Sequence, residues 1–230
     1  MKILAVGPHP DDVEFGCAPL LIQEAREGHD VRILVLSKGE AGTSGAPEER
    51  AQEARNAAAI IGATVEFLDF GGDCHLQSTP ERAIALAGEI RRFQPDIVLA
   101  PHPEENQHPD HSAVAAMVRD ASRLARYGGL DELRGLPPHS IRSLYYFSIT
   151  HTVDARPDLV IDVSEVETEW EAAMKCHQTQ MRAKSYLRLV QTRARALGAA
   201  IGVEAAVGLW VNDPIRVRRL SDLDLSSRNF

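Results

Sequence analysis

The sequence predicts an α/β fold in which a Rossmann-like, mainly parallel sheet is flanked by helices and has its active site at the carboxyl ends of the strands. Short apolar runs alternate with segments of helical periodicity through the first 125 residues, which is the pattern of right-handed βαβ units. The run 31–36 is apolar enough for a strand covered on both faces. No low-complexity linker or internal repeat divides the chain, so residues 1–230 are expected to form a single domain.

The expected strands are short apolar segments that run into polar loops. The first leads directly into Gly-Pro-His-Pro-Asp-Asp, and the third leads into the Gly71-Gly72 turn. The second half of the chain is less regular, but two segments there have the apolar composition of strands. In order along the chain, the expected strands are 2–6, 31–36, 65–70, 97–100, 143–149 and 159–163.

The expected helices lie between these strands and have apolar residues at three- and four-residue spacing. Gly28 and Gly62 follow the first two helices and are expected to end them. Thr79 is expected to be the N-cap of the third helix. In order, the expected helices are 15–26, 48–61, 80–93 and 111–125, with one or two more helices in 166–197.

This layout predicts where a site should lie. In open parallel sheets, ligands bind in the crevice beyond the carboxyl ends of the strands. The loops that follow the first four strands hold nearly all the unusual polar clustering of the chain. These loops contain His9–Asp12, Ser37–Pro47, Gly71–Leu76 and His102–His111.

The first cluster is His9-Pro10-Asp11-Asp12. A histidine and a carboxylate three residues apart on a tight turn can face one ion, and Pro10 stiffens that turn by fixing its φ angle. Taken alone, the cluster has an equally simple interpretation, because Asp11 or Asp12 can cap the helix that follows.

The second cluster, His108-Pro109-Asp110-His111, follows the fourth strand and is therefore expected at the same sheet edge. Together the two clusters can offer two imidazoles and one carboxylate to a divalent metal, with a further Asp and His left over. Catalytic zinc has three protein ligands of this kind and an open fourth position, whereas structural zinc sites are more often rich in Cys. The pattern favours a hydrolytic Zn²⁺, although nickel, iron or cobalt would accept the same ligands.

Two motifs resemble those of the LmbE-like, or PIG-L, deacetylase family. These are Ala-Val-Gly-Pro-His-Pro-Asp-Asp-Val-Glu-Phe-Gly near the N-terminus and Gln-His-Pro-Asp-His at 107–111. Segments 37–50, 173–180 and 201–206 also resemble the family, and they look most like the bacterial enzymes that deacetylate N-acetylglucosaminyl-malate in bacillithiol synthesis.

The resemblance implies zinc-dependent hydrolysis of the acetamide of an N-acetylglucosamine-type conjugate. It implies His9, Asp12 and His111 as zinc ligands, Asp11 as general base, and His108 as a protonated group that stabilises the oxyanion. Asp110 is expected to orient an imidazole and to favour its charged form. A homo-oligomer, with a hexamer as one form, is also implied.

Three residues are candidates for substrate binding. Arg50 can pair with an acidic group such as a malate carboxylate, or it can be an exposed helical Arg among glutamates. Asp73 can bind sugar hydroxyls or cap a turn. Asn106 stands where some relatives have a tyrosine that helps to bind the reacting carbonyl. His177 resembles a residue of the family's C-terminal segment, where a packing role is equally consistent with the sequence.

Composition narrows the partners and the compartment. The net charge of −8 argues against broad binding to nucleic acid or to anionic membranes. No apolar stretch reaches the length of a signal peptide core or a membrane span, and three cysteines without a CxxC pair indicate a cytoplasmic protein. Cys17, Cys74 and Cys176 are expected to be small buried residues. His29, His75, His139 and His151 are expected to have no role in the site.

Three alternatives stay open. A same-family deacetylase could act on a chitobiose-like, inositol-linked or antibiotic substrate, because the metal motifs serve only the amide. A nucleotide- or sugar-binding module is disfavoured, because the first turn has His and Asp where such modules have GxGxxG. A metal-binding protein without turnover is the third alternative. It would need neither Asp11 nor His108, and the presence of both favours an enzyme.

Overall fold

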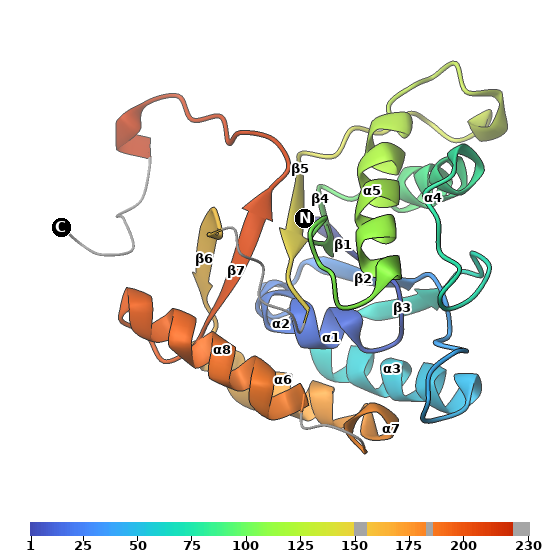
Figure 1. Cartoon of the computed structure of the whole chain (residues 1–230). Coiled ribbons are helices and arrows are strands. Elements are labelled where there is room, and N and C mark those ends of the chain that lie inside the picture. Colours follow the sequence, from blue (N-terminus) through green and yellow to red (C-terminus); the bar gives the residue numbers. More distant parts are fainter. Residues whose placement is uncertain (150–155, 183–185, 223–230) are drawn as a thin grey trace.

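The computed structural model describes residues 1–149, 156–182 and 186–222, and its centre is one seven-stranded sheet (Figure 1). The strand order is β3-β2-β1-β4-β5-β7-β6, which confirms the predicted α/β class. The strands are β1 (Lys2–Gly7), β2 (Asp30–Val35), β3 (Thr64–Phe67), β4 (Ile97–Pro101), β5 (Ser143–Phe147), β6 (Leu159–Asp162) and β7 (Ala206–Val211).

The helices fill the connections between the strands. In the first half they are α1 (Asp12–Gly16), α2 (Ala18–Arg26), α3 (Pro47–Ile61), α4 (Pro80–Phe93) and α5 (Pro109–Leu124). In the second half they are α6 (Glu167–Lys175), α7 (Gln178–Met181) and α8 (Tyr186–Ile201), with short 3-10 turns at Asp131–Leu133, Ser164–Val166 and Leu220–Asp222. None of the helices in these described ranges is long and apolar enough to cross a lipid bilayer.

The sheet is parallel from β3 to β5 and changes direction at one strand. β1 pairs in parallel with β2 and β4, and β4 pairs in parallel with β5. β7 lies between β5 and β6 and is antiparallel to both. β7 was not expected from the sequence, because its apolar run Ala206–Val211 lies after the last regular strand–helix alternation.

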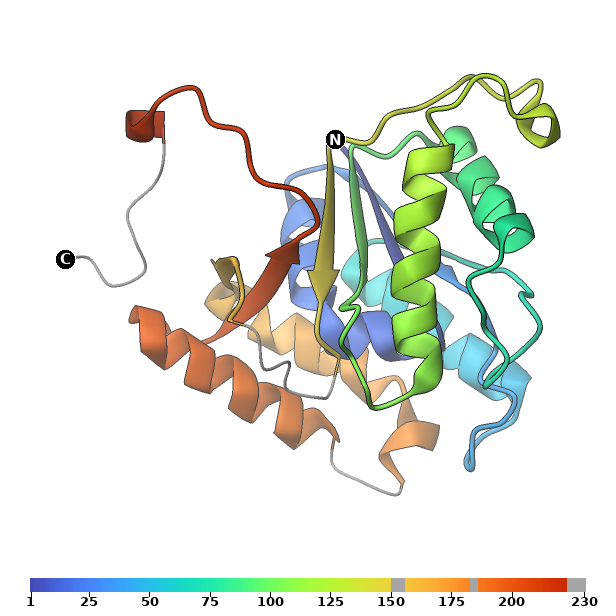
Figure 2. The same ribbon diagram turned by 45° about the horizontal axis from the view of Figure 1, so that its top comes forward.

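Two hydrophobic cores cover the two faces of the sheet. One core packs α1, α2, α3, α6 and α8 against one face, and the other packs α4 and α5 against the opposite face. Figures 1 and 2 show α4 and α5 together on one side of the strands and α6 and α8 together on the other. Both faces are therefore covered, as expected for a mainly parallel sheet.

Several element boundaries differ from the predicted ones for local reasons. The predicted helix 15–26 is broken at Cys17, whose φ of −143° is not helical, and Pro19 lies in the first turn of the next helix, α2. In the described part of 166–197 the structure has three helices, where one or two were predicted. Thr79 caps α4 as predicted, because its hydroxyl accepts the Arg82 backbone N–H at 3.4 Å.

The fold brings the predicted loops to one place. The turn after β1, the start of α3, the loop after β3 and the start of α5 all follow carboxyl ends of parallel strands. In Figures 1 and 2 the amino end of α5 lies beside α1. The two His-Pro-Asp segments therefore meet at one edge of the sheet.

Candidate active site

The turn after β1 holds three of the predicted site residues. The His9 backbone N–H donates to Oδ2 of Asp12 at 3.0 Å, which closes the turn on itself. Asp11 has a φ of 126°, a conformation that costs an L-residue energy and that is often found at functional sites. Asp11 occupies the N-cap position of α1, but its side chain makes no capping hydrogen bond. The simple capping interpretation of Asp11 is therefore wrong.

His9, Asp12 and His111 form one buried cluster. Nδ1 of His9 lies 3.0 Å from Oδ2 of Asp12, and Nε2 of His111 lies 3.4 Å from Oδ1 of Asp12. α5 begins at Pro109, two residues earlier than predicted, so His111 is in its first turn and faces the β1 turn. The cluster thus joins residues about 100 positions apart in the sequence.

The charges in this cluster support one another. Burial alone would raise the pKa of Asp12, but the imidazoles of His111 and His9 hold it well below its ordinary value. Burial would likewise lower the pKa of His9 and His111, but the Asp12 carboxylate raises both. A buried carboxylate between two imidazoles attracts positive charge, which can be supplied by protons or by a metal ion.

The donor set fits a catalytic zinc ion. One potential ligand atom from each of His9, Asp12 and His111 lies within 4.8 Å of the others, and all three residues are buried. Two nitrogens and one carboxylate oxygen are the ligands typical of hydrolytic zinc. Nδ1 of His111 is buried and has no hydrogen-bond partner among the described residues, so this ring nitrogen has no competing protein partner there.

Asp110 contacts the far side of His9. Its Oδ2 atom lies 3.1 Å from Nε2 of His9 and accepts the Cys74 backbone N–H at 2.8 Å. An imidazole that binds metal through one nitrogen commonly donates the other N–H to a carboxylate, which fixes its tautomer and orientation. This geometry agrees with the orienting role expected of Asp110.

Asp73 also belongs to this group. Its Oδ1 atom lies 3.1 Å from Nε2 of His9, 3.4 Å from Sγ of Cys74 and 3.5 Å from Nε2 of His108. The side chain is 7% exposed. Asp73 therefore faces the imidazoles of the site, and turn capping does not account for it.

Asp11 and Arg50 face each other, and both line one cavity of the structure. Arg50 is 4% exposed and donates from Nη1 to the Gly39 carbonyl and from Nη2 to the Pro10 carbonyl. Its Nη2 atom lies 3.5 Å from Oδ1 of Asp11. Burial and the nearby Asp12 charge raise the pKa of Asp11 to about 7, although Arg50 opposes that shift. The exposed-Arg interpretation is wrong for Arg50, because this guanidinium is buried and joins two loops.

His108 caps α5 with its own ring. Its Nδ1 atom accepts the Asp110 backbone N–H at 3.2 Å, so the neutral ring has its proton on Nε2. Burial and the neighbouring His9 lower the pKa of His108. The expectation of a protonated His108 is corrected by this geometry, which favours a neutral imidazole with an Nε2–H donor. A neutral imidazole can still donate a hydrogen bond to a developing oxyanion.

Most of these residues line one cavity of about 280 Å³. Asn106 does not line it and is exposed, while its neighbour Gln107 does line it. Glu105 turns inward and accepts the Ile149 backbone N–H at 3.1 Å, which leaves Asn106 facing solvent. The lining residues are His9, Asp11, Asp12, Phe15, Ala41, Gly42, Thr43, Arg50, Asp73, Cys74, Gln107, His108, His111, Ile149, Gln180 and Tyr186.

The sequence analysis missed several buried polar residues behind the site. Glu105 is 1% exposed, and its charge raises the pKa of His111. Glu14 lies 3.3 Å from Nε2 of the fully buried His177. Glu53 accepts hydrogen bonds from the backbone N–H and the hydroxyl of Thr179, at 2.9 and 2.6 Å. The sequence carried a signal for Glu14 alone, which lies between the apolar residues Val13 and Phe15 of α1 and therefore needs a buried partner.

The cysteines and the remaining histidines are outside the proposed ligand set. Cys17 is buried as predicted, but Cys74 is exposed and Cys176 is half-buried, so the prediction was wrong for these two. Cys74 has a φ of 67° on the loop that Asp110 holds, which turns its side chain toward the cavity. His29, His75 and His139 bind Glu24, the Asp73 carbonyl and the Pro95 carbonyl respectively. His151 lies outside the described residues.

The chain matches one protein-family model and is similar in sequence to several known proteins. Residues 4–122 match the model of the family described as PIG-L, GlcNAc-PI de-N-acetylase. The chain is 31% identical to the diacetylchitobiose deacetylase of Thermococcus kodakarensis, over 78% of this chain and 70% of that one. It is also 26% identical to the 4-oxalmesaconate hydratase of Pseudomonas putida, over 88% of this chain and 83% of that one.

The solved structures agree with these sequence matches. The conserved protein TT1542 of Thermus thermophilus superimposes with a TM-score of 0.84 at 31% identity, covering 94% of this chain and 96% of that one. N,N'-diacetylchitobiose deacetylase of Pyrococcus horikoshii shares the fold, with a TM-score of 0.82 at 22% identity over 91% of this chain and 83% of that one. The two sequence motifs, the shared fold and the match over residues 4–122 show that this chain is an enzyme of the PIG-L de-N-acetylase family.

Proposed function

We propose that this enzyme hydrolyses the acetamide of an N-acetylglucosamine-type sugar and releases acetate and the free amine. The observation that carries the proposal is the placement of Asp11 at a cavity wall directly beside the His9, Asp12 and His111 cluster. A general base, a three-ligand metal site and a hydrogen-bond donor then surround the space in which an amide carbonyl would lie. Because an amide is a poor electrophile, its hydrolysis needs an activated nucleophile and a stabilised oxyanion, and these groups can supply both.

His9, Asp12 and His111 would hold the metal, with Zn²⁺ as the expected ion. When bound, zinc polarises a carbonyl and lowers the pKa of a coordinated water. Asp11 accepts the proton of the attacking water and later delivers a proton to the leaving nitrogen as the C–N bond breaks. The Nε2–H group of His108 donates to the oxygen that becomes negatively charged. Removal of one donor of this kind commonly costs about 3 kcal/mol of transition-state stabilisation.

The charge of the cavity bears on the rest of the substrate. Among the described residues that line it, Arg50 is the one Arg or Lys side chain, and it already lies 3.5 Å from Asp11 and donates to two carbonyls. A malate carboxylate would have to compete with Asp11 for that guanidinium. This arrangement supports an uncharged N-acetylglucosaminide, such as a chitobiose-like sugar, over N-acetylglucosaminyl-malate.

The test is a substrate panel with the zinc-loaded enzyme. Acetate and free amine are measured with diacetylchitobiose, N-acetylglucosamine and N-acetylglucosaminyl-malate. We expect equimolar acetate and amine, with kcat/KM at least about tenfold higher for an uncharged sugar than for the malate conjugate. A preference for the malate conjugate would contradict the inference from Arg50 and leave the hydrolysis standing. Hydration of an unsaturated carboxylic acid without any amide cleavage would contradict the proposed function itself.

A further inference from the structure

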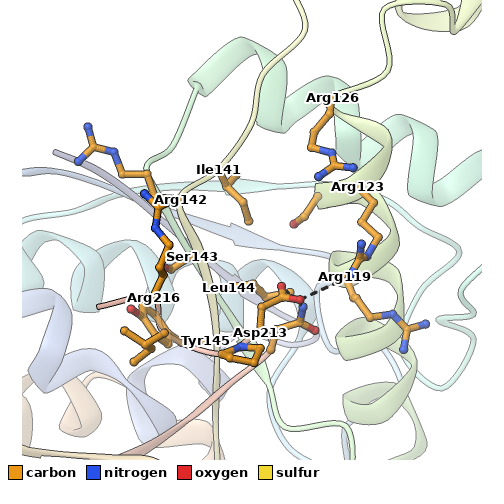
Figure 3. A pocket seen from close by; sticks show the side chains of 14 residues that line it. Arg119, Arg123, Arg126, Ile141, Arg142, Ser143, Leu144, Tyr145, Asp213 and Arg216 are labelled. Atoms are coloured by element: carbon orange, nitrogen blue, oxygen red, sulfur yellow. Dashed lines mark hydrogen bonds and ion pairs between the residues drawn. The ribbon is translucent and has the colours of Figure 1, made fainter. Parts of the chain in front are cut away.

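A second cavity, larger than the first, lies far from the cluster of His9, Asp12 and His111. It has a volume of about 360 Å³ and is bounded by the carboxyl half of α5, the amino end of β5 and the segment after β7. Figure 3 shows arginines on two sides of it, with Arg119, Arg123 and Arg126 on one side and Arg142 and Arg216 on the other. This volume is within the range of small-molecule sites, which is about 300–1,000 Å³.

The charge of this cavity is opposite to that of the whole chain. Its lining has five arginines and one acidic residue, Asp213, which gives 5 − 1 = +4. The complete chain has a net charge of −8. Such a local concentration of one sign attracts ligands of the opposite sign.

The carboxylates near the cavity only partly neutralise these arginines. Arg123 lies 3.7 Å from Asp213, in an exposed pair. Arg119 and Arg142 pair with Asp120 and Asp96, two residues that are not part of the lining. In the described ranges of the chain, Arg126 and Arg216 have no carboxylate within 4.0 Å.

The α5 side of the cavity brings like charges together. Arg119 and Arg123 are four residues apart on α5, so their charges lie on one face of the helix and repel, and Arg126 follows two residues after the helix ends. Ser122, from the same wall, is 6% exposed, and its hydroxyl has no hydrogen-bond partner among the described residues. An oxyanion in the cavity would relieve the repulsion and could accept a hydrogen bond from this hydroxyl.

We propose that this cavity binds a small multivalent oxyanion, which is a phosphorylated or polycarboxylate molecule. Guanidinium groups suit this class, because each presents parallel N–H donors that match two oxygens of a phosphate or carboxylate. The site is separate from the catalytic cavity, since Arg123 is twelve residues beyond His111 on the same helix, or about 18 Å at 1.5 Å per residue. The proposal does not depend on the deacetylase function.

The experiment measures binding of pyrophosphate and of citrate to the full chain by calorimetry at fixed ionic strength. The cavity variant is Arg123→Gln/Arg126→Gln. Its matched control is Arg188→Gln/Arg195→Gln on α8, which removes the same charge from exposed positions. We expect 1:1 saturable binding of at least one anion, weakened at least about tenfold in the cavity variant and unchanged in the control. Tighter pyrophosphate binding assigns a phosphorylated ligand, and tighter citrate binding assigns a polycarboxylate.

Three results would overturn the proposal. Equal binding by both double variants would place the anion elsewhere, including at the metal. Absence of saturable binding of both anions would show that the arginines only screen one another. Self-association of the wild type that is lost in the cavity variant, without any anion effect, would make the surface a protein interface. Melting curves of both variants establish that each is folded.

Discussion

The Nε2 atom of His9 lies 3.1 Å from Oδ2 of Asp110, although 101 positions separate the two residues. The other nitrogen of the same ring lies 3.0 Å from Asp12. One imidazole therefore connects the proposed metal ligands to a buried carboxylate on α5. A hydrogen bond of this kind fixes which ring nitrogen is free to bind metal.

Substitution of Asp110 should weaken zinc binding more than it changes the fold. We expect Asp110→Asn to raise the Kd for zinc about 10–100-fold, as measured by competition with a chromogenic chelator. Asp69→Asn is the control, since Asp69 accepts a hydrogen bond from Gly71 on an exposed loop. An equal zinc affinity in the two variants would show that Asp110 does not position His9.

Arg50 should set the pH dependence of the reaction. Burial and the Asp12 charge raise the pKa of Asp11, the Arg50 charge lowers it, and the net pKa is about 7. Removing the Arg50 charge raises the Asp11 pKa further, so less carboxylate is present at a given pH. In Arg50→Gln we expect the acid limb of kcat/KM to move to higher pH and kcat to fall.

The control for this prediction is Arg55→Gln on the same helix, where the side chain covers the Phe67 ring. A bound metal shifts the acid limb of kcat/KM to lower pH in the wild type and in both variants. The comparison therefore uses only the difference in that pH between the proteins. If Arg50→Gln raised KM and left the acid limb in place, Arg50 would be a substrate ligand, which is one of the two roles that the sequence left open.

Cys74 should be the thiol whose modification blocks the cavity. Its Sγ atom lies 3.5 Å from Nε2 of His108, and the residue is exposed, whereas Cys17 is buried. Local desolvation and the Asp73 carboxylate raise the pKa of the Cys74 thiol. Alkylation by iodoacetamide should therefore accelerate as the pH rises. We expect inactivation in parallel with alkylation of Cys74, measured by mass spectrometry, and equal inactivation of Cys74→Ser would contradict this.

Gly16 should tolerate no side chain. A Cβ atom there would lie 2.4 Å from Cδ2 of Phe147, which is fully buried under α1. We expect Gly16→Ala to cost about 1–3 kcal/mol of folding free energy, measured by denaturant unfolding. Gly129→Ala is the control, because nothing lies within 4 Å of its added Cβ. Equal unfolding midpoints for the two variants would show that the packing at Phe147 is loose.

The sequence predicted the elements that have strong local signals. β1, β2, β4 and the helices of the first half follow from apolar runs, helical spacing and the stops at Gly28 and Gly62. β7 was missed although Ala206–Val211 is an apolar run, because it follows the last regular strand–helix alternation and its place between β5 and β6 depends on long-range pairing. The C-terminal helices were predicted as one or two, because no Gly or Pro follows the ends of α6 at Lys175 and of α7 at Met181.

The candidate site was predicted in outline from its two motifs. Their positions after β1 and β4 sufficed to bring His9, Asp12 and His111 together. The partners of Arg50, the inward turn of Glu105 and the tautomer of His108 depend on loop conformations that the sequence does not reveal. These features required the three-dimensional structure.

The central claim is that Asp11 is the base of a metal-dependent amide hydrolysis. The most direct measurement compares acetate release and bound zinc in the wild type and Asp11→Asn, with diacetylchitobiose as substrate. We expect full zinc content in both proteins and a loss of about 10²–10⁴ in kcat/KM in the variant. A variant that keeps its zinc and stays within tenfold of the wild-type rate would contradict the claim.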